Sequence, residues 1–145
     1  MMASYKCTPQ RIEDIPAAAR NARGIINDAD AFVYVSTEYY QTIPPALTNM
    51  IIHFDTDIFS GKPAALVCYS DGVFGGCRAA MALRAFVAAT GALTIPTILY
   101  IPSTPAQIDN QGAARNSHIT FQAKRLIAHL DYCLAAFTTH RKDTG

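Results

Sequence analysis

The stretch that organises this chain is Ala31-Phe32-Val33-Tyr34-Val35-Ser36-Thr37-Glu38-Tyr39-Tyr40-Gln41-Thr42. Its first five residues are apolar or aromatic, and two of them are valines, a composition typical of a strand buried on both faces in a parallel sheet. The stretch becomes polar at Ser36, and Pro44-Pro45 begins a helical pattern a few residues later. We therefore expect a buried strand that ends in a polar, aromatic loop and continues into a helix. In open α/β sheets, loops at the carboxyl ends of strands carry the ligand site.

A second loop of the same kind follows an apolar run at residues 64–69. It reads Ser70-Asp71-Gly72-Val73-Phe74-Gly75-Gly76. Glycines between a strand and a helix let backbone N–H groups approach a ligand closely, although this loop lacks the Gly-Lys-Ser/Thr of a nucleotide P-loop. We expect the two loops to face one ligand. The adjacent tyrosines could pack on a flat aromatic ligand or on a partner subunit. A purely structural interpretation stays open for both loops, with the glycines as a helix start and the tyrosines as a hydrophobic cover for the following helix.

Strands alternate with helices along the chain. Helical patterns cover residues 14–28, 45–54, 77–90 and 118–137, and strand patterns cover residues 31–35, 64–69 and 95–101. Asp14 is expected to cap the first helix, residues 4–8 could be a short extended piece, residues 102–116 are expected to be irregular, and residues 138–145 loose. The alternation predicts βαβ units and a parallel sheet, so the fold class is α/β, in a single domain of residues 1–145.

Composition excludes several classes of protein. Of the 145 residues, 50% are hydrophobic and 16% charged, which argues against disorder. A net charge of +1 gives no indication of nucleic acid or of an anionic membrane surface as a partner. No run reaches the ~18 apolar residues of a membrane span, and the first residues do not resemble a signal peptide. We expect a cytoplasmic protein.

Cysteines and histidines show no metal-binding spacing. The four cysteines have no C-x-x-C pair, and the four histidines, His53, His118, His129 and His140, share no ligand pattern with them or with one another. We predict no metal site, and we interpret the cysteines as reduced structural thiols. Cys77 lies at a helix start beside Arg78, where a thiolate is favoured, so a redox role stays open as a minor alternative.

Two blocks of the sequence resemble the NADPH-dependent FMN reductase family. The first runs from Asp30-Ala31 through Thr42 to Ile43-Pro44-Pro45-Ala46-Leu47-Thr48-Asn49, and is similar to the family's Ala-Asp, hydrophobic strand, Pro-Glu-Tyr-Asn, Ser-Ile-Pro and Leu-Lys-Asn. The second runs from Gly61-Lys62-Pro63 to Gly75-Gly76-Cys77-Arg78 and is similar to the family's Gly-Lys-Pro strand and Gly-Gly-x-Arg turn. The resemblance extends in order over about residues 12–134.

The resemblance implies a three-layer flavodoxin-like parallel sheet flanked by helices, with an FMN ring against the two loops. The matching cofactor-binding positions are Thr37, Glu38, Tyr39, Tyr40, Ser70, Gly72, Gly75 and Gly76. The implied function is an oxidoreductase that passes a hydride from NADPH to FMN and on to a small-molecule electron acceptor. The cofactor carries that chemistry, so no catalytic side chain is assigned. A homodimer or homotetramer is implied, with Glu38 and Arg78 near the subunit contacts.

The chain departs from the family pattern in two places. Thr37 replaces the family proline, and Tyr40 replaces the asparagine, so we expect Tyr40 to fill the space where the amide meets the ring. The family's N-terminal strand, Gly-Ser-x-Arg phosphate loop, first helix and second strand have no match, which predicts an N-terminally truncated sheet with about three recognisable strands. Without its neighbour, the strand at residues 32–35 would be an open edge that favours association of two chains.

Three interpretations of the function follow. The first is a flavin-dependent NAD(P)H oxidoreductase with weakened FMN binding. The second is a non-enzymatic or flavin-deficient relative that acts as a dimerisation or interaction module. The third is an incomplete gene product.

Overall fold

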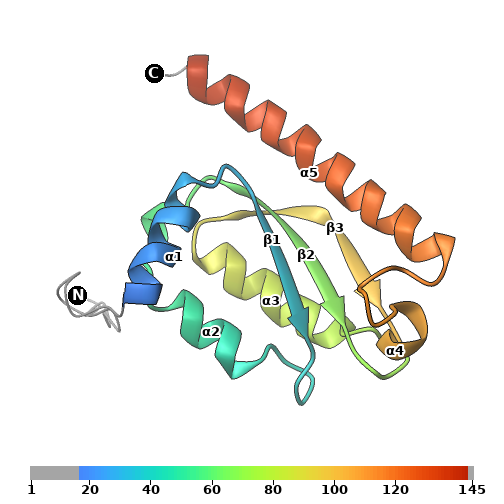
Figure 1. Ribbon diagram of the computed structural model, residues 1–145. Coiled ribbons are helices and arrows are strands. Elements are labelled where there is room, and N and C mark those ends of the chain that lie inside the picture. Colours follow the sequence, from blue (N-terminus) through green and yellow to red (C-terminus); the bar gives the residue numbers. More distant parts are fainter. Residues whose placement is uncertain (1–16, 144–145) are drawn as a thin grey trace.

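A computed structural model describes the backbone of residues 17–143 and the side chains of residues 20–138. Helices and strands alternate along these residues (Figure 1). In chain order the elements are α1 (Ala17–Asp28), β1 (Phe32–Thr37), α2 (Pro45–Ile51), a 3₁₀ turn (Thr56–Ile58), β2 (Pro63–Tyr69), α3 (Cys77–Ala89), β3 (Leu93–Ile101), α4 (Thr104–Gln107) and α5 (Ser117–Asp143).

The three strands form one parallel sheet in the order β1-β2-β3, with β2 in the centre. Thr37 pairs with Tyr69, and Tyr69 pairs with Ile101, so all three strands end at the same edge of the sheet. The loops that follow the strands therefore lie side by side. The predicted α/β class, the parallel sheet and the three strands are confirmed for the described residues.

Two hydrophobic cores lie on opposite faces of the sheet, which makes the fold three-layered. The face covered by α2 and α3 buries Leu66 and Cys68 of β2 with Leu83 and Val87 of α3. The opposite face is covered by α5. Its core is formed by Ala65 and Val67 of β2, Ile95 and Leu99 of β3, and Leu126 and Leu130 of α5. Successive residues of β2 point to opposite faces, and both faces are covered, so an unbroken apolar run is what this central strand requires. Each large side chain buried here stabilises the fold by about 1.5–3 kcal/mol.

The side chain of Lys62 caps the C-terminal end of α1. Its ammonium group donates hydrogen bonds to the carbonyl oxygens of Ile26 (3.3 Å) and Asn27 (2.7 Å), and it lies 5.6 Å from the centre of the Phe32 ring. A cation at a helix C-terminus interacts favourably with the exposed carbonyl groups and the helix dipole. The Gly-Lys-Pro segment before β2 thus joins α1 to the start of the sheet.

The structure corrects some of the predicted boundaries. The prediction that residues 138–145 are loose is wrong for residues 138–143, because α5 continues to Asp143. No glycine or proline interrupts residues 138–143, so nothing in the local sequence ends the helix there. The predicted irregular segment at residues 102–116 contains the short helix α4, and the second helix ends at Ile51 instead of residue 54. The predicted cap at Asp14 and the extended piece at residues 4–8 lie outside the described residues.

Candidate functional site

A carboxylate links the two loops that the sequence singles out. Glu38 Oε2 accepts a hydrogen bond from the backbone N–H of Ala79 at 3.2 Å, and Glu38 Oε1 lies 3.8 Å from Arg78 Nη1. The Glu38 side chain is only 13% exposed. A carboxylate at the first turn of a helix satisfies a free N–H group and interacts favourably with the helix dipole. Glu38 therefore holds the loop after β1 against the N-terminus of α3, directly beside the glycine loop.

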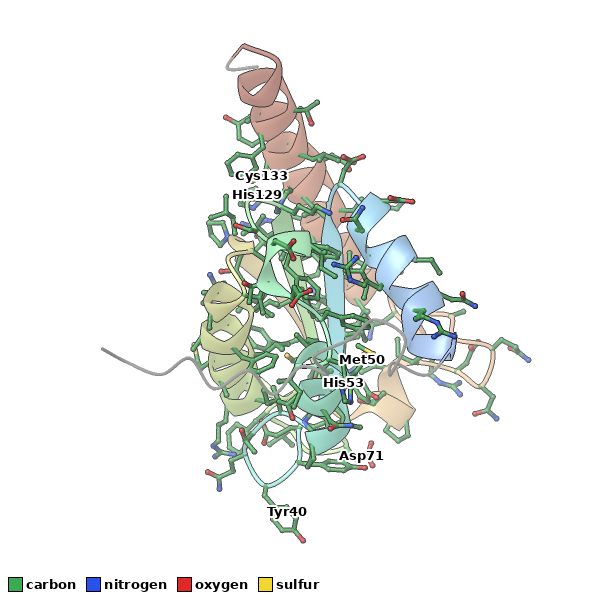
Figure 2. All side chains as sticks on the ribbon, turned by 90° about the vertical axis from the view of Figure 1, so that its left-hand side faces the viewer. Tyr40, Met50, His53, Asp71, His129 and Cys133 are labelled. Atoms are coloured by element: carbon green, nitrogen blue, oxygen red, sulfur yellow. The ribbon has the colours of Figure 1, made fainter. Side chains whose placement is uncertain are left out.

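The loop after β1 closes in a tight turn. Tyr39 and Thr42 exchange two backbone hydrogen bonds of 2.9 Å, and the residues between them, Tyr40 and Gln41, have φ angles of +47° and +66°. This is the conformation of a two-residue hairpin turn, which normally takes asparagine and glycine because both central residues are left-handed. Tyr40 is fully exposed and projects from the tip of the turn (Figure 2). The turn therefore directs the Tyr40 side chain into solvent, and its contact with a flavin ring stays a prediction.

Two glycines of the second loop are required by the packing of the chain on itself. Gly75 has φ +58°, and a Cβ there would lie 2.9 Å from the backbone nitrogen of Pro102. Gly76 has φ +75°, and a Cβ there would lie 3.1 Å from both Cys68 Cβ and the backbone nitrogen of Tyr69. Both contacts are with the ends of strands, so these two glycines position the loop. The approach of the loop to the strand ends therefore explains why both positions are glycine, while their contact with a ligand stays a prediction.

Gly72 differs from these glycines because its surroundings are open. A Cβ there would meet only Ser70 Oγ, at 3.9 Å. Its carbonyl oxygen accepts hydrogen bonds from Ser70 Oγ (3.2 Å) and from the backbone N–H of Ser103 (3.0 Å). The loop is therefore held in place while leaving an uncovered stretch of backbone at the edge of the sheet.

The segment after β3 supports the glycine loop, and the sequence interpretation missed it. Thr104 donates hydrogen bonds to the carbonyl oxygen of Ser70 from its backbone N–H (3.1 Å) and its hydroxyl (3.0 Å). Ser103 has φ +47° where the chain turns into α4. The Ser-Thr-Pro that follows the apolar strand is a helix-start pattern and could have indicated this turn.

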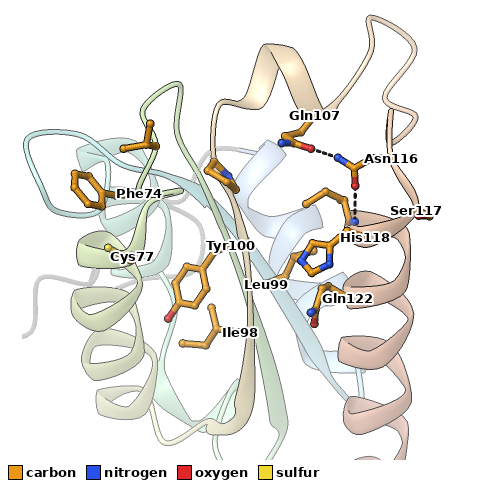
Figure 3. Close-up of a pocket in the computed structure, with 13 residues that line it drawn as sticks. Phe74, Cys77, Ile98, Leu99, Tyr100, Gln107, Asn116, Ser117, His118 and Gln122 are labelled. Carbon is orange, nitrogen blue, oxygen red and sulfur yellow. Dashed lines mark hydrogen bonds between the residues drawn. The ribbon is translucent and has the colours of Figure 1, made fainter.

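A groove of about 660 Å³ lies along the outer side of β3, between α3 and α5 (Figure 3). Asn116 Oδ1 accepts a hydrogen bond from the backbone N–H of Ile119 at 3.0 Å, and the Asn116 amide also donates to Gln107 Oε1. Burial raises the pKa of Tyr100. The groove is lined by side chains distant in the sequence, among them Phe74, Cys77, Tyr100, His118 and Gln122.

The thiol beneath the glycine loop is inert. Cys68 is free and fully buried. Burial, and to a lesser degree the charge of Glu38, raises the pKa of its thiol to about 11. A thiol with that pKa stays protonated at neutral pH and is a poor nucleophile, which agrees with a structural role.

The loops provide one part of what FMN requires. Tyr39 is 55% exposed, and the backbone at Gly72 is open, so a flat ring has an aromatic surface and uncovered peptide groups to contact. The phosphate of FMN is best bound at a helix N-terminus. Among the described helices, however, the N-terminus of α3 is met by Glu38 and that of α5 by Asn116. The described residues thus fit the ring, and one N–H group at each of these two helix ends is already bonded to a side chain of the chain itself.

Within the described part of the chain, we find no helix whose length and apolar character would let it cross a membrane.

The sequence of this chain matches a known protein family and is similar to two reductases. Residues 2–106 match the NADPH-dependent FMN reductase family. A quinone reductase of Pseudomonas putida is 36% identical over 81 residues, which are 50% of this chain and 44% of that protein. An NADPH azoreductase of a Bacillus species is 26% identical over 113 residues, which are 78% of this chain and 64% of that protein. The chain thus spans about half to two thirds of the length of these relatives.

Solved structures show the same fold. The flavoenzyme NAD(P)H:(acceptor) oxidoreductase FerB of Paracoccus denitrificans superimposes with a TM-score of 0.69 at 22% identity, over 88% of this chain and 71% of FerB. The general stress protein 14 of Treponema denticola, solved in complex with FMN, superimposes with a TM-score of 0.51 at 18% identity, over 82% of this chain and 74% of that protein. These superpositions establish the fold. The family match covers well over half of the sequence. The chain therefore belongs to the NADPH-dependent FMN reductase family.

Proposed function

We propose that this chain is a flavin-dependent NAD(P)H oxidoreductase that uses FMN, takes its reducing equivalents from NADPH and passes them to a small-molecule acceptor. The observation that carries the proposal is the hydrogen bond between Glu38 and Ala79, because it joins the aromatic loop and the glycine loop into one surface. That surface lies at the carboxyl ends of the parallel strands, where α/β sheets bind their ligands.

The proposed cofactor-binding residues divide into two groups. Tyr39 and the backbone around Gly72 are accessible, so we assign them to contact with the flavin ring. Glu38, Gly75 and Gly76 are occupied by contacts within the chain, so we assign them to holding the loops in place. The remaining positions, Thr37, Tyr40 and Ser70, border the same loops.

FMN supplies the chemistry when it is bound, since it accepts a hydride and returns electrons singly or in pairs. The protein has to bind the ring, orient it and leave one side open for the donor and the acceptor. Quinones and azo compounds are the acceptor classes we propose, since the names of two relatives state them. Both are flat, conjugated molecules that suit the open surface between the loops.

The proposal is tested by titrating the purified chain with FMN while following flavin fluorescence, and then by measuring NADPH oxidation with a quinone or an azo dye. We expect saturable binding in the micromolar range and FMN-dependent turnover. Gly72→Val is the informative variant, because it fills open space beside the ring without a left-handed φ, and should weaken FMN binding at least tenfold while the unfolding midpoint stays close to that of the parent. If high micromolar protein leaves flavin fluorescence unchanged, the chain is not a flavoenzyme on its own.

A second candidate function is a flavin-deficient interaction module. It is favoured by one observation: Glu38 and Asn116 each accept a hydrogen bond from a backbone N–H group at the N-termini of α3 and α5, which leaves fewer donors there for a phosphate. Riboflavin separates the two candidates. An oxidoreductase that holds only the ring side should bind riboflavin and FMN with similar affinity, whereas an interaction module should bind neither.

The remaining parts of the proposal concern assembly and location. We propose that residues 1–145 act as one domain and that the chain forms a homo-oligomer. Glu38 and Arg78 would contribute to the subunit contact, where the exposed Phe74 ring, 4.8 Å from the Arg78 guanidinium, adds apolar surface. The proposed compartment is the cytoplasm, where free thiols such as those of Cys77 and Cys133 stay reduced.

A further inference from the structure

Two carbonyl groups of the glycine loop (residues 70–76) are held by the segment that follows β3. The Ser70 carbonyl oxygen accepts hydrogen bonds from the backbone N–H of Thr104 at 3.1 Å and from the Thr104 hydroxyl at 3.0 Å. The Gly72 carbonyl oxygen accepts a hydrogen bond from the backbone N–H of Ser103 at 3.0 Å. Both carbonyl groups therefore point toward the start of α4, which lies beside the ends of β2 and β3 (Figure 1).

The direction of these carbonyl groups fixes the direction of two N–H groups. In a planar trans peptide, the carbonyl oxygen and the N–H of the next residue point in opposite directions, and no peptide bond of the described residues is cis. The N–H groups of Asp71 and Val73 therefore point away from Ser103 and Thr104. Because β2 lies between β1 and β3, this direction leads from the side of β3 toward the loop after β1, which carries Tyr39.

The N–H groups of Asp71 and Val73 are available to a ligand. Both residues are exposed, and neither N–H group has a hydrogen-bond acceptor within the described residues. A flavin ring presents carbonyl oxygens and unprotonated nitrogens as acceptors, and hydrogen bonds to such atoms are a means by which proteins hold the ring and adjust its electronic properties. The orientation of this short stretch of backbone is therefore what a flavin bound between the two loops would depend on.

We propose that Thr104 is a positioning residue of the flavin site. Its hydroxyl holds the Ser70 carbonyl group on the side of β3, and the N–H groups of Asp71 and Val73 then face the ring. Thr104 acts through the loop and does not itself contact the flavin. This role rests on the proposed function, since it requires that the two loops bind a flavin.

The loop depends on this support because its internal hydrogen bonds are longer. Ser70 Oγ donates to the Gly72 carbonyl oxygen at 3.2 Å, and the Gly75 N–H approaches the same oxygen at 3.5 Å. Both distances exceed those of the two hydrogen bonds from Thr104. A loop that has the correct orientation for only part of the time binds its ligand more weakly in the same proportion. Loss of the Thr104 hydroxyl should thus weaken flavin binding without removing a group that touches the ring.

A purely structural role for Thr104 predicts a different result, and Thr97 is the matched control. Thr97 lies in the middle of β3 and is half-buried like Thr104. Its hydroxyl forms a hydrogen bond of 2.6 Å with His129 Nδ1, a side chain of α5. Removal of either hydroxyl costs the fold one hydrogen bond, but only the bond from Thr104 reaches the glycine loop. If Thr104 served stability alone, the two losses would have the same effect on flavin.

Riboflavin titrations of Thr104→Val, Thr104→Ser and Thr97→Val, followed by flavin fluorescence, test the proposal. Thr104→Val keeps the shape and the backbone N–H and should raise the riboflavin dissociation constant about threefold or more, the usual effect of losing one hydrogen bond. Thr104→Ser keeps the hydroxyl, so it should bind within about twofold of the parent, as should Thr97→Val. Parent-like binding by Thr104→Val overturns the proposal. So does an equal loss in Thr97→Val or in Thr104→Ser.

Residual dipolar couplings of the flavin-free chain test the orientation directly, because they report the direction of each N–H bond. The couplings of Asp71 and Val73 should change in Thr104→Val and match the parent in Thr104→Ser and Thr97→Val. Unchanged couplings in Thr104→Val overturn the role of Thr104 and leave the proposed function standing, provided that the parent binds riboflavin. A parent chain that binds no riboflavin overturns the proposed function, and with it this role of Thr104.

Discussion

The carboxylate of Glu38, at the end of β1, accepts a hydrogen bond of 3.2 Å from the backbone N–H of Ala79, in the first turn of α3. The two residues are 41 positions apart. The contact joins the loop after the first described strand to the helix that follows the second. This contact brings together the two parts of the sequence that resemble the family, so its removal should affect both stability and ligand binding.

Glu38→Ala should lower the free energy of unfolding by about 1 kcal/mol, the usual effect of losing a side chain that caps a helix N-terminus. Glu38→Gln keeps an acceptor oxygen and loses the charge, so its effect should be smaller. Urea denaturation measures both, and Asp71→Ala, which removes an exposed carboxylate from the neighbouring loop, is the control. Equal losses for Glu38→Ala and Asp71→Ala would show that the hydrogen bond to Ala79 contributes nothing.

Alanine substitutions at two glycines should distinguish a glycine required by close packing from one that only adds flexibility to the unfolded chain. Gly75→Ala should destabilise the protein by about 2 kcal/mol or more, because the new Cβ would lie 2.9 Å from the Pro102 nitrogen at a φ of +58°. Gly24→Ala, in the middle of α1 with no atom within 4 Å of the new Cβ, should stabilise it by about 0.5–1 kcal/mol. Thermal unfolding of the two variants should therefore shift in opposite directions. A neutral Gly75→Ala would contradict the close approach of the loop to β3.

The turn at Tyr40 and Gln41 should be improved by the residues its backbone favours. The double variant Tyr40→Asn and Gln41→Gly matches the left-handed φ angles of +47° and +66° and should stabilise the protein by about 1 kcal/mol. Because the Tyr40 side chain is fully exposed, Tyr40→Phe should leave stability within about 0.5 kcal/mol of the parent. Differential scanning calorimetry distinguishes the two. A double variant that melts earlier than the parent would mean that Tyr40 makes a contact worth more than the backbone strain.

Alkaline pH should destabilise the fold through Cys68. Burial raises the pKa of this thiol from 9.0 to about 11, so between those values the unfolded chain has lost a proton that the folded chain still holds. The free energy of unfolding should thus be unaffected below pH 9 and fall above it, by up to about 1.4 kcal/mol per pH unit. The raised pKa of Tyr34, about 12, continues the fall at higher pH.

Urea midpoints at pH 8 and pH 10.5 measure this slope. Cys68→Ala should be less stable than the parent at pH 8, since it leaves space in the core, and its stability should depend less on pH between the two values. The same slope in the parent and in Cys68→Ala would assign the pH dependence to other groups.

Local patterns in the sequence determined the class of fold and the order of its elements. The apolar run at residues 64–69 corresponds to β2, which is covered on both faces, and the pattern at residues 77–90 corresponds to α3. These predictions were right because the spacing of apolar residues within one element depends on which of its faces are covered. The end of α5 was predicted wrongly, because a polar segment without helix breakers can continue a helix that packing has already started.

The tertiary structure decided what the residues of the candidate site do. Gly75 and Gly76 hold the loop against the strand ends, and the Tyr40 side chain points into solvent, and neither arrangement follows from the sequence pattern. The groove beside Tyr100 was equally hidden in the sequence, since its walls come from elements that only the packing of the chain brings together. Periodicity shows which face of an element is apolar, but only the pairing of strands and the packing of helices decide what that face meets.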